Sequence, residues 1–243
     1  METQLIYHSC PSQYSCSTQV IFSGEDEEGK YIIPMETIFY FGGGGQPADI
    51  GNLVTEEGAS FPIMKVVPEE NAFKHYFQGP SGCFKPGEPI QITISPQVRD
   101  LHSRIHTAGH LVSSVITEAL HIPLVPLKGY HYPDSPYVEC GNPKGLTDID
   151  LKGAQASLTA YILKDLPVTA FLQQGDQVPL HTFKPPGFQL TPGKTMRWVG
   201  IESFLFYPCA GTHAGSTGAL KEVKIKYIKS KKGNVRIAYQ VSP

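Results

Sequence analysis

The first 95 residues contain short apolar runs rich in β-branched and aromatic residues. Glycines, prolines and acidic residues separate these runs, as is typical of short strands joined by turns. We expect strands at residues 18–22, 31–34, 37–41, 61–67, 74–77 and 89–95. Their regular spacing predicts a small β-barrel.

The pattern changes to a helical period after Ser95. Apolar residues then recur at alternating steps of four and three, at Leu101, Ile105, Ala108, Val112, Val115 and Ala119. This spacing predicts an amphipathic helix that ends before Pro123, with Ser95 as its N-cap and Pro96 in its first turn. A second helix is expected from Thr147, with Asp150 completing an approximate capping box, to about Lys164.

Strand patterns return in the last third of the chain, at residues 167–172, 195–202, 222–229 and 234–241. The last two alternate cleanly and flank residues 230–233, which predicts a β-hairpin. Strands mixed with two helices predict an α+β layer. We therefore expect two domains, a barrel over 1–95 and an α+β domain over 96–243.

Composition narrows the class of protein. The 24 glycines and 21 prolines disfavour a helical bundle, and 40% hydrophobic residues exclude a wholly disordered chain. Five cysteines are an odd number without framework spacing, which argues against a disulfide-rich secreted domain. The first residues lack the basic start and apolar core of a signal peptide, and no apolar run reaches 18 residues, so neither a signal peptide nor a membrane-spanning helix is expected. A cytoplasmic protein is the expectation.

The net charge of −2 hides a difference between the two halves of the chain. Residues 1–95 carry 4 basic and 12 acidic residues, whereas residues 96–243 carry 16 and 10. Residues 221–232 contain six lysines and one acidic residue, Glu222. Such a run is ordinarily a solvated hairpin, but it can also contact phosphates.

Two pairs of residues have spacings suited to a metal. His106 and His110 lie four apart on the first helix, so their side chains share a face. Cys209 and His213 flank a turn that contains Gly211. One sulfur and three nitrogens form a set that zinc prefers. Each pair alone has a simpler explanation. The two histidines also fit the polar side of an amphipathic helix, and His102 with His106 has the same spacing. Cys209 also fits a small buried side chain.

A glycine-rich segment, Gly42–Gly45 followed by Gln46 and Pro47, is the third unusual feature. It is either a flexible turn or a loop whose backbone comes close to a ligand. It is not a Walker loop, because no Gly-Lys-Ser/Thr follows.

These motifs, in this order, resemble the AlaX-type trans-editing proteins, relatives of the editing domain of alanyl-tRNA synthetase. The matching segments are residues 39–49, Arg104 to His110 and Cys209 to His213, and the hairpin strand 234–239 is also similar. The chain departs from the family pattern at Phe41, where proline is common, and at Ala210, where glycine is usual. The resemblance implies the medium-sized form, with a barrel followed by a two-layer editing domain like the second additional domain of threonyl- and alanyl-tRNA synthetases.

The resemblance further implies a zinc-dependent hydrolase that removes serine, or sometimes glycine, from tRNA for alanine. The metal ligands would be His106, His110, Cys209 and His213. Candidate catalytic residues are Gln46, Thr107 and His102, although His102 is more simply a surface histidine. Candidate substrate-binding residues are Gly43, Gly44, Gly45, Arg104, Thr212, Lys229, Lys231 and Lys232. The residue that senses the serine hydroxyl is expected between Gly129 and Ser135.

Two other functions stay open. A zinc-stabilised module could bind tRNA without hydrolysing it, because four protein ligands usually close a zinc site. Another zinc hydrolase, such as a peptidase, is disfavoured because no glutamate lies between His106 and His110. An aminoacylating ligase is not expected, because the two domains leave no room for an ATP-activating domain.

Overall fold

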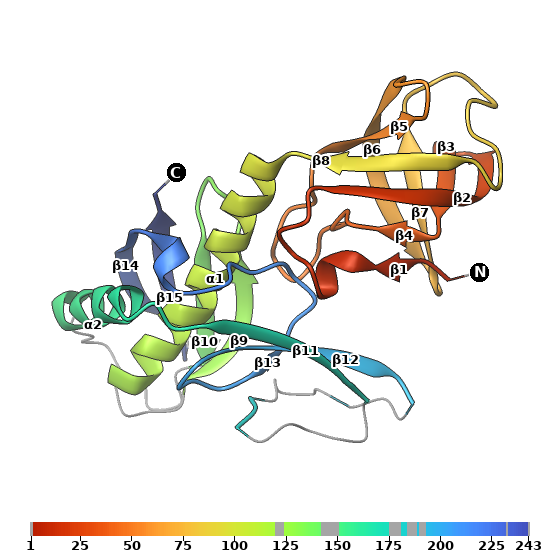
Figure 1. Ribbon diagram of the computed structural model, residues 1–243. Coiled ribbons are helices and arrows are strands. Elements are labelled where there is room, and N and C mark those ends of the chain that lie inside the picture. Colours follow the sequence, from red (N-terminus) through yellow and green to blue (C-terminus); the bar gives the residue numbers. More distant parts are fainter. Residues whose placement is uncertain are drawn as a thin grey trace. The chain divides into compact units, whose positions relative to one another are not determined.

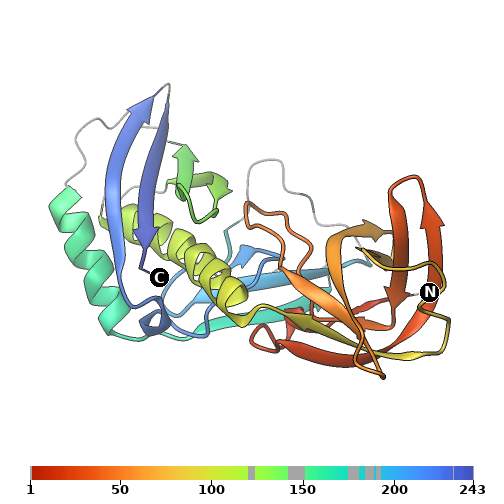
Figure 2. The same ribbon diagram turned by 90° about the horizontal axis from the view of Figure 1, so that it is seen from above.

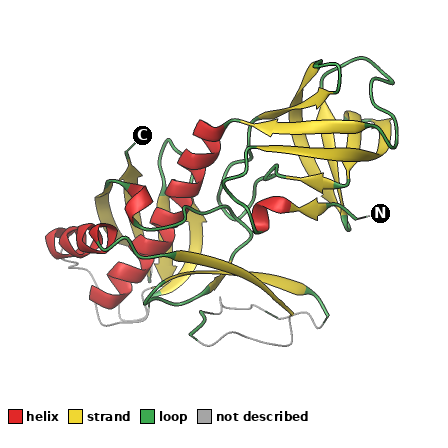
Figure 3. Ribbon diagram, viewed as in Figure 1, coloured by secondary structure: helices red, strands yellow, loops and turns green. Residues whose placement is uncertain are grey.

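The computed structural model describes residues 2–119, 124–141, 151–174, 181–183, 189, 193–231 and 233–242. It divides into two compact units within the long first helix: residues 1–43 with 47–100, and residues 44–46 with 101–243. Figure 3 shows that the first unit consists mainly of strands and that the second combines strands with the two long helices. Among the described residues, no helix is long and apolar enough to cross a membrane.

Six strands of the first unit pair in a closed ring, in the order β2-β3-β7-β6-β5-β8 (Figure 1). All six pairings are antiparallel. The ring strands are β2 (Ser15–Asp26), β3 (Gly29–Pro34), β5 (Gly51–Thr55), β6 (Ser60–Glu69), β7 (Ala72–Phe77) and β8 (Pro89–Ile94). The short strands β1 (Gln4–Leu5) and β4 (Glu36–Thr37) pair in parallel beside the 3-10 turn η1 (Ile6–His8). Alternating residues such as Leu53 and Ile92 fill the interior.

The strand expected at 37–41 is wrong beyond Thr37, although Ile38, Phe39 and Tyr40 are buried. Side chains satisfy much of its backbone in place of a neighbouring strand. The Tyr40 N–H donates to Asp49 Oδ2 at 2.7 Å, and the Ile38 carbonyl accepts from the Arg99 guanidinium. Arg99 also forms a fully buried ion pair with Asp49. A buried apolar segment therefore looks like a strand in sequence even where polar side chains replace the ladder.

The first helix, α1 (Pro96–Ala119), begins where the sequence predicts. The Val98 N–H donates to Ser95 Oγ at 3.4 Å, as expected of an N-cap. The second helix, α2 (Leu151–Leu163), is confirmed over its described length. Its expected cap at Thr147 and Asp150 lies outside the described residues.

The second unit contains two sheets. One has the order β14-β15-β10-β9, from β9 (Val125–Tyr130), β10 (Tyr137–Gly141), β14 (Val223–Lys231) and β15 (Asn234–Val241). The other has the order β11-β12-β13, from β11 (Val168–Gln174), β12 (Thr195–Ile201) and β13 (Tyr207–Pro208). The 3-10 turn η2 (Gly218–Leu220) precedes the antiparallel hairpin β14–β15, which the sequence predicts. Strands β9 and β10 were not expected.

Helices α1 and α2 pack on one face of the four-stranded sheet (Figure 2). Their apolar stripes meet side chains that alternate along the strands, such as Val138, Ile225 and Ile237. Gln155 of α2 also bridges to β14, donating to the Val223 carbonyl and accepting from the Ile225 N–H. This core fixes α1, and therefore its histidines, against the sheet.

Candidate metal centre

His106 and His110 project from one face of α1, as their spacing predicts. Their ring centroids lie 5.2 Å apart. His106 is 2% exposed, and His110 is half-buried. The helix thereby presents two imidazoles one turn apart.

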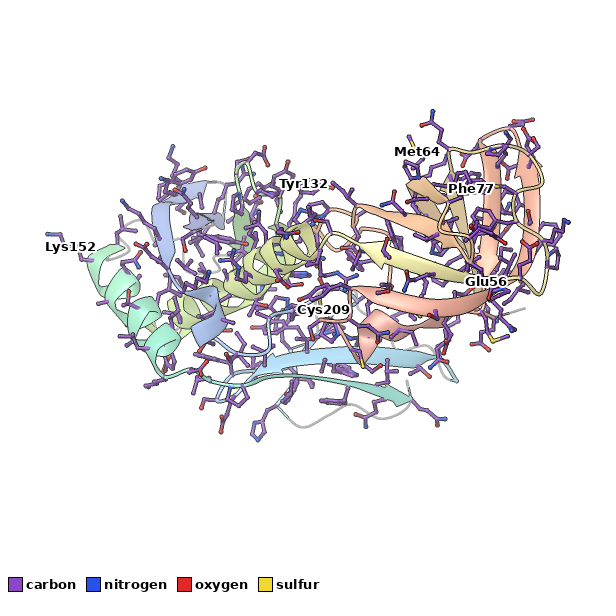
Figure 4. All side chains as sticks on the ribbon, turned by 45° about the horizontal axis from the view of Figure 1, so that its top comes forward. Glu56, Met64, Phe77, Tyr132, Lys152 and Cys209 are labelled. Carbon is purple, nitrogen blue, oxygen red and sulfur yellow. The ribbon has the colours of Figure 1, made fainter. Side chains whose placement is uncertain are left out.

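Cys209 and His213 lie on the turn that follows β13. The Cys209 N–H donates to the Arg197 carbonyl of β12, at 3.0 Å. The buried Arg197 guanidinium returns two bonds, to the carbonyls of Cys209 at 2.9 Å and of Gly211 at 2.7 Å. The turn is therefore held on both sides, and it directs the thiol and the imidazole toward α1. Figure 4 shows Cys209 beside this helix.

The four side chains form one cluster whose potential ligand atoms all lie within 4.8 Å of one another. Cys209 Sγ is 3.5 Å from His106 Nε2 and 3.3 Å from His213 Nε2. In tetrahedral zinc sites, bonds of about 2.3 Å to sulfur and about 2.0 Å to nitrogen separate these atoms by about 3.6 Å. The donor set and its spacing therefore fit zinc.

The buried setting favours the protonation state in which histidine binds metal. Burial and the neighbouring Arg197 lower the pKa of His110 to about 4. Burial and the surrounding imidazoles hold the pKa values of His106 and His213 well below the ordinary range. Burial raises the pKa of the Cys209 thiol. A bound cation would favour its thiolate.

Gln46 determines which nitrogen of His106 faces the cluster. Its Oε1 accepts from the Thr212 backbone N–H at 3.0 Å, so this atom is an acceptor. His106 Nδ1, 2.8 Å from the same oxygen, must therefore carry a proton and donate it. The remaining lone pair of His106 is then on Nε2, directed at Cys209. Gln46 Nε2 donates to Thr212 Oγ1 at 2.8 Å, which fixes the amide from its other end.

Thr107 plays the matching part for His213. Its hydroxyl donates to the Ser103 carbonyl at 2.8 Å and accepts from the Ala214 N–H at 3.0 Å. His213 Nδ1, at 3.2 Å, can then only donate to this oxygen. The lone pair of His213 is again on Nε2. Hydrogen bonds to the far nitrogen are the usual way in which proteins orient metal-binding histidines.

Two glycines permit this close assembly. A Cβ on Gly211 would lie 2.3 Å from the His106 ring and 2.8 Å from Gln46 Oε1. A Cβ on Gly45, whose φ is +80°, would lie 2.2 Å from the Gly129 carbonyl oxygen. The Gly45 carbonyl in turn accepts from the His131 N–H at 2.7 Å. The glycine-rich segment is thus a close backbone approach and not a free turn.

His131 is a site residue that the sequence located only to a segment of seven residues. Its ring stacks on His106, with centroids 4.4 Å apart and an interplanar angle of 23°. Its Nδ1 lies 2.7 Å from the Tyr239 hydroxyl, which donates to the Ile105 carbonyl. Nδ1 is therefore the donor, and Nε2 is left as an acceptor. Burial lowers the pKa of His131 to about 3. His131 follows the last residue of β9, outside any strand, so no alternation in the sequence indicates where its ring points.

A cavity of about 250 Å³ opens beside the cluster. It is lined by His106, His110 and Cys209, and also by Gly44 and His131. Of the predicted site residues that the structure describes, only these ligands and Gly44 line it. It is smaller than most sites for drug-sized ligands, so it suits a small group.

The other candidates occupy different places. The sequence-based expectation that His102 is a surface histidine is wrong, because the residue is 7% exposed. Arg104 donates to the Ser242 carbonyl at 2.7 Å. Thr212 is fully buried and lies 2.7 Å from Ser103 Oγ. Gly43, with φ +108°, belongs to the first unit, and its carbonyl accepts from the Tyr40 hydroxyl.

The lysine run lies on the hairpin. Lys229 is exposed on β14, with its Nζ 4.6 Å from the centroid of the Tyr227 ring. Lys231 ends the strand, and its side chain lies outside the described part of the chain, as does all of Lys232.

Comparison with known proteins gives one family match. Residues 196–238 match the threonyl and alanyl tRNA synthetase second additional domain. This range includes Cys209, His213 and most of the β14–β15 hairpin.

Several longer relatives are similar over most of the chain. Alanine–tRNA ligases of Methanopyrus kandleri and Pyrococcus abyssi are 24% and 26% identical over 225 residues, which is 92% of the chain. The chain spans 24% of the length of each of these ligases. The alanyl-tRNA editing protein AlaX-M of Methanosarcina acetivorans is 27% identical over 237 residues, covering 87% of the chain and 89% of that protein.

Proposed function

The chain belongs to the AlaX-type family of alanyl-tRNA editing proteins, and from this premise we propose that it is a hydrolase acting on mischarged tRNA. The reaction is cleavage of the ester between serine, or glycine, and tRNA for alanine. The observation that carries the proposal is the cluster of His106, His110, Cys209 and His213 beside a small cavity. In this proposal the six-strand ring is the family's N-terminal barrel, residues 1–95, and residues 96–243 are its editing domain.

We propose that the four clustered residues hold zinc. When bound there, zinc would supply Lewis acidity toward an ester carbonyl or a water molecule. The residues around it have a separate task, which is to keep each ligand in its binding form. Gln46 and Thr107 contact the Nδ1 atoms of His106 and His213 and not the cavity. We therefore assign them as positioning residues, although the sequence suggested a catalytic role.

The cavity provides groups that suit a small aminoacyl ester. Gly44 and its neighbour Gly45 belong to the close backbone approach at one wall, where backbone N–H groups can bind an oxygen. His131 lines the same cavity with a neutral ring whose Nε2 is an acceptor. We propose that this atom accepts the hydroxyl proton of a seryl group. Glycine, which lacks that hydroxyl, would be held less specifically.

The remaining candidates have subsidiary roles in this proposal. Thr212 supports the site through a buried hydrogen bond to Gln46, and Arg104 through a partly buried one to the Ser242 carbonyl. His102 is buried on α1 and is not among the residues that line the cavity, so we do not assign it as a general base for the reaction. Lys229, Lys231 and Lys232 contact phosphates of the tRNA, because they extend a run of positive charge along the hairpin.

A second function is favoured by one observation. Four protein ligands fill the tetrahedral shell that zinc prefers in structural sites. On this alternative, the protein is a zinc-stabilised module that binds tRNA without hydrolysing it. A protein that hydrolyses the ester must either release one ligand when substrate binds or use the metal to position the substrate.

One experiment separates the two functions. Purified protein is incubated with seryl-, glycyl- and alanyl-tRNA for alanine, and the ester remaining is followed with time. The same assay is run with Cys209→Ala and, as a matched control, with Cys83→Ala, a cysteine of the first unit. Editing predicts rapid loss of serine with the intact protein and with Cys83→Ala but not with Cys209→Ala. Stable esters in every reaction would favour the binding module.

A further inference from the structure

The four-stranded sheet of the second unit has one covered face and one open face. Val138, Val235 and Ile237 point to the covered face, where α1 and α2 pack. The residues that alternate with them point away from the helices. Paired positions on neighbouring strands share a face, so the strand register identifies the open side.

Three tyrosines form a stack on this open side. Tyr130 of β9 and Tyr137 of β10 are direct cross-strand partners, with ring centroids 5.4 Å apart and planes within 14°. Tyr132 continues the stack on the other side of Tyr130, at 4.6 Å and 21°. Its outer face has no aromatic partner among the described residues, and the side chain is 39% exposed. Figure 4 shows Tyr132 at the surface of the unit.

Cations accompany these rings. The Arg236 guanidinium lies 4.2 Å from the centroid of Tyr137 and pairs with Glu139 at 3.0 Å. Arg236 is also the cross-strand partner of Lys229, whose Nζ lies over Tyr227. Tyr227 is 38% exposed. Arginine and lysine therefore cover one side of two of the tyrosine rings.

The charge of this face is positive overall. The register aligns Lys128, Glu139, Arg236 and Lys229 across the four strands, three cations with one acid. Asp134 is a second acid, on the turn after Tyr132. A face that combines exposed aromatic rings with excess cations is suited to unpaired nucleotides, whose bases stack on rings while their phosphates meet cations. Bases inside a duplex cannot offer their faces in this way.

The stack is also next to the cavity along the chain. Tyr130 and Tyr132, whose rings stack on each other, flank His131 in sequence, and His131 lines the cavity. Lys128, which begins the row of charges, lines the cavity itself. A nucleic acid strand with its end in the cavity would leave across this edge of the sheet.

We propose that the open face of the sheet β14-β15-β10-β9 is a platform for the unpaired 3′ end of the RNA, with Tyr132 and Tyr227 as its base-stacking residues. The choice of RNA as occupant rests on the function proposed above. Stacking of bases on these tyrosines does not depend on whether the protein hydrolyses the ester. Contact between the lysine run and phosphates alone would not stack bases on the rings.

The test measures the binding of RNA that carries no ester to hydrolyse. An acceptor-stem RNA hairpin with a four-nucleotide unpaired 3′ extension is compared with the same hairpin cut blunt, both without an amino acid. Affinities are measured by fluorescence anisotropy for the wild-type protein and for Tyr132→Ala, Tyr227→Ala and Tyr132→Phe. Phe171→Ala is the matched control, since Phe171 is 36% exposed but lies on β11 in the other sheet. Thermal melting checks that each variant is folded.

The proposal predicts that Tyr132→Ala and Tyr227→Ala each weaken binding of the extended hairpin by roughly tenfold. Binding of the blunt hairpin should not change, and Tyr132→Phe and Phe171→Ala should bind as the wild type does. A 2-aminopurine in the extension should lose fluorescence on binding, since stacked bases are quenched. The proposal is overturned if the alanine variants bind the extended hairpin normally, or lose affinity equally for the blunt one. Since the RNA carries no ester, failure of the hydrolysis assay leaves this result unaffected.

Discussion

Gln46 and His106 lie 60 residues apart in sequence, yet Gln46 Oε1 accepts the Nδ1 proton of His106 at 2.8 Å. This contact joins the glycine-rich segment to α1 and leaves the Nε2 lone pair of His106 directed at Cys209. Orienting contacts of this kind typically change metal affinity by about 10- to 100-fold.

Gln46→Ala should therefore weaken zinc binding by roughly tenfold or more, because His106 loses the acceptor that fixes its tautomer. Affinity is measured by competition with a chelator of known strength. Gln91→Ala, at an exposed position of β8, is the control and should bind zinc as the wild type does. Equal affinities for the two variants would show that Gln46 does not orient the ligand.

Gly211→Ala should disrupt the cluster, because the new Cβ would lie 2.3 Å from the His106 ring. We expect at least a tenfold loss of zinc affinity, measured by the same competition. Gly215→Ala is a matched control four residues later, where nothing lies within 4 Å of an added Cβ. If both variants retain full affinity, the turn does not pack against His106 as described.

His131→Phe should keep the stacking on His106 but remove the Nε2 acceptor from a ring that lines the cavity. If that atom accepts the seryl hydroxyl, kcat/KM for seryl-tRNA falls by about tenfold or more, because a buried polar group of the substrate loses its partner. The value for glycyl-tRNA should change little. An unchanged ratio of the two values would assign serine recognition to another residue.

His75 should make the stability of the first unit depend on pH. It is fully buried, and burial lowers its pKa from 6.5 to about 4. Between these values the unfolded chain binds a proton that the folded chain does not, so stability falls as the pH drops from 6.5 toward 4. Over this range the free energy of unfolding should fall by about 3 kcal/mol.

The His75→Gln variant, which cannot titrate there, isolates this effect. Urea unfolding is followed at several pH values, and the difference between the two proteins is taken at each, since other buried histidines contribute to both. The difference should change by about 3 kcal/mol across the window. A difference independent of pH would mean that His75 is protonated in the folded protein.

Replacing Lys229, Lys231 and Lys232 together by alanine should weaken tRNA binding and flatten its salt dependence. Each lost phosphate contact lowers the slope of log affinity against log salt by about one. Lys85→Ala, at an exposed position in the first unit, is the control. A slope identical to the wild type would exclude the hairpin from phosphate contact.

The sequence predicts some parts of this fold well because their signals are local. The periodic apolar positions and the Ser95-Pro96 cap locate α1, and clean alternation locates the β14–β15 hairpin. The strand expected at 37–41 fails because its burial depends on Arg99 and Asp49, which are distant in sequence. Strands β9 and β10 carry glycines, prolines and lysines that blur their alternation.

The candidate site, too, is predictable from sequence only where its signals are local. Spacing within a helix or a turn suggests each pair of metal ligands, and the structure brings the two pairs together. The roles of Gln46 and Thr107 could not be read from sequence, since they depend on which nitrogen of a distant histidine each contacts. The sequence limits serine recognition only to residues 129–135 and does not single out His131, because this residue follows the end of β9 and its ring is placed by His106 and Tyr239, which are distant in sequence.

The proposed function depends on His106, His110, Cys209 and His213 holding one zinc ion. Zinc-edge X-ray absorption on the purified protein, together with its metal content, tests this arrangement. We predict one zinc per chain with one sulfur at about 2.3 Å and nitrogen at about 2.0 Å, and loss of the sulfur contribution in Cys209→Ser. A zinc shell without sulfur, or a protein that binds no zinc when it is supplied, would show that these four residues do not hold the metal.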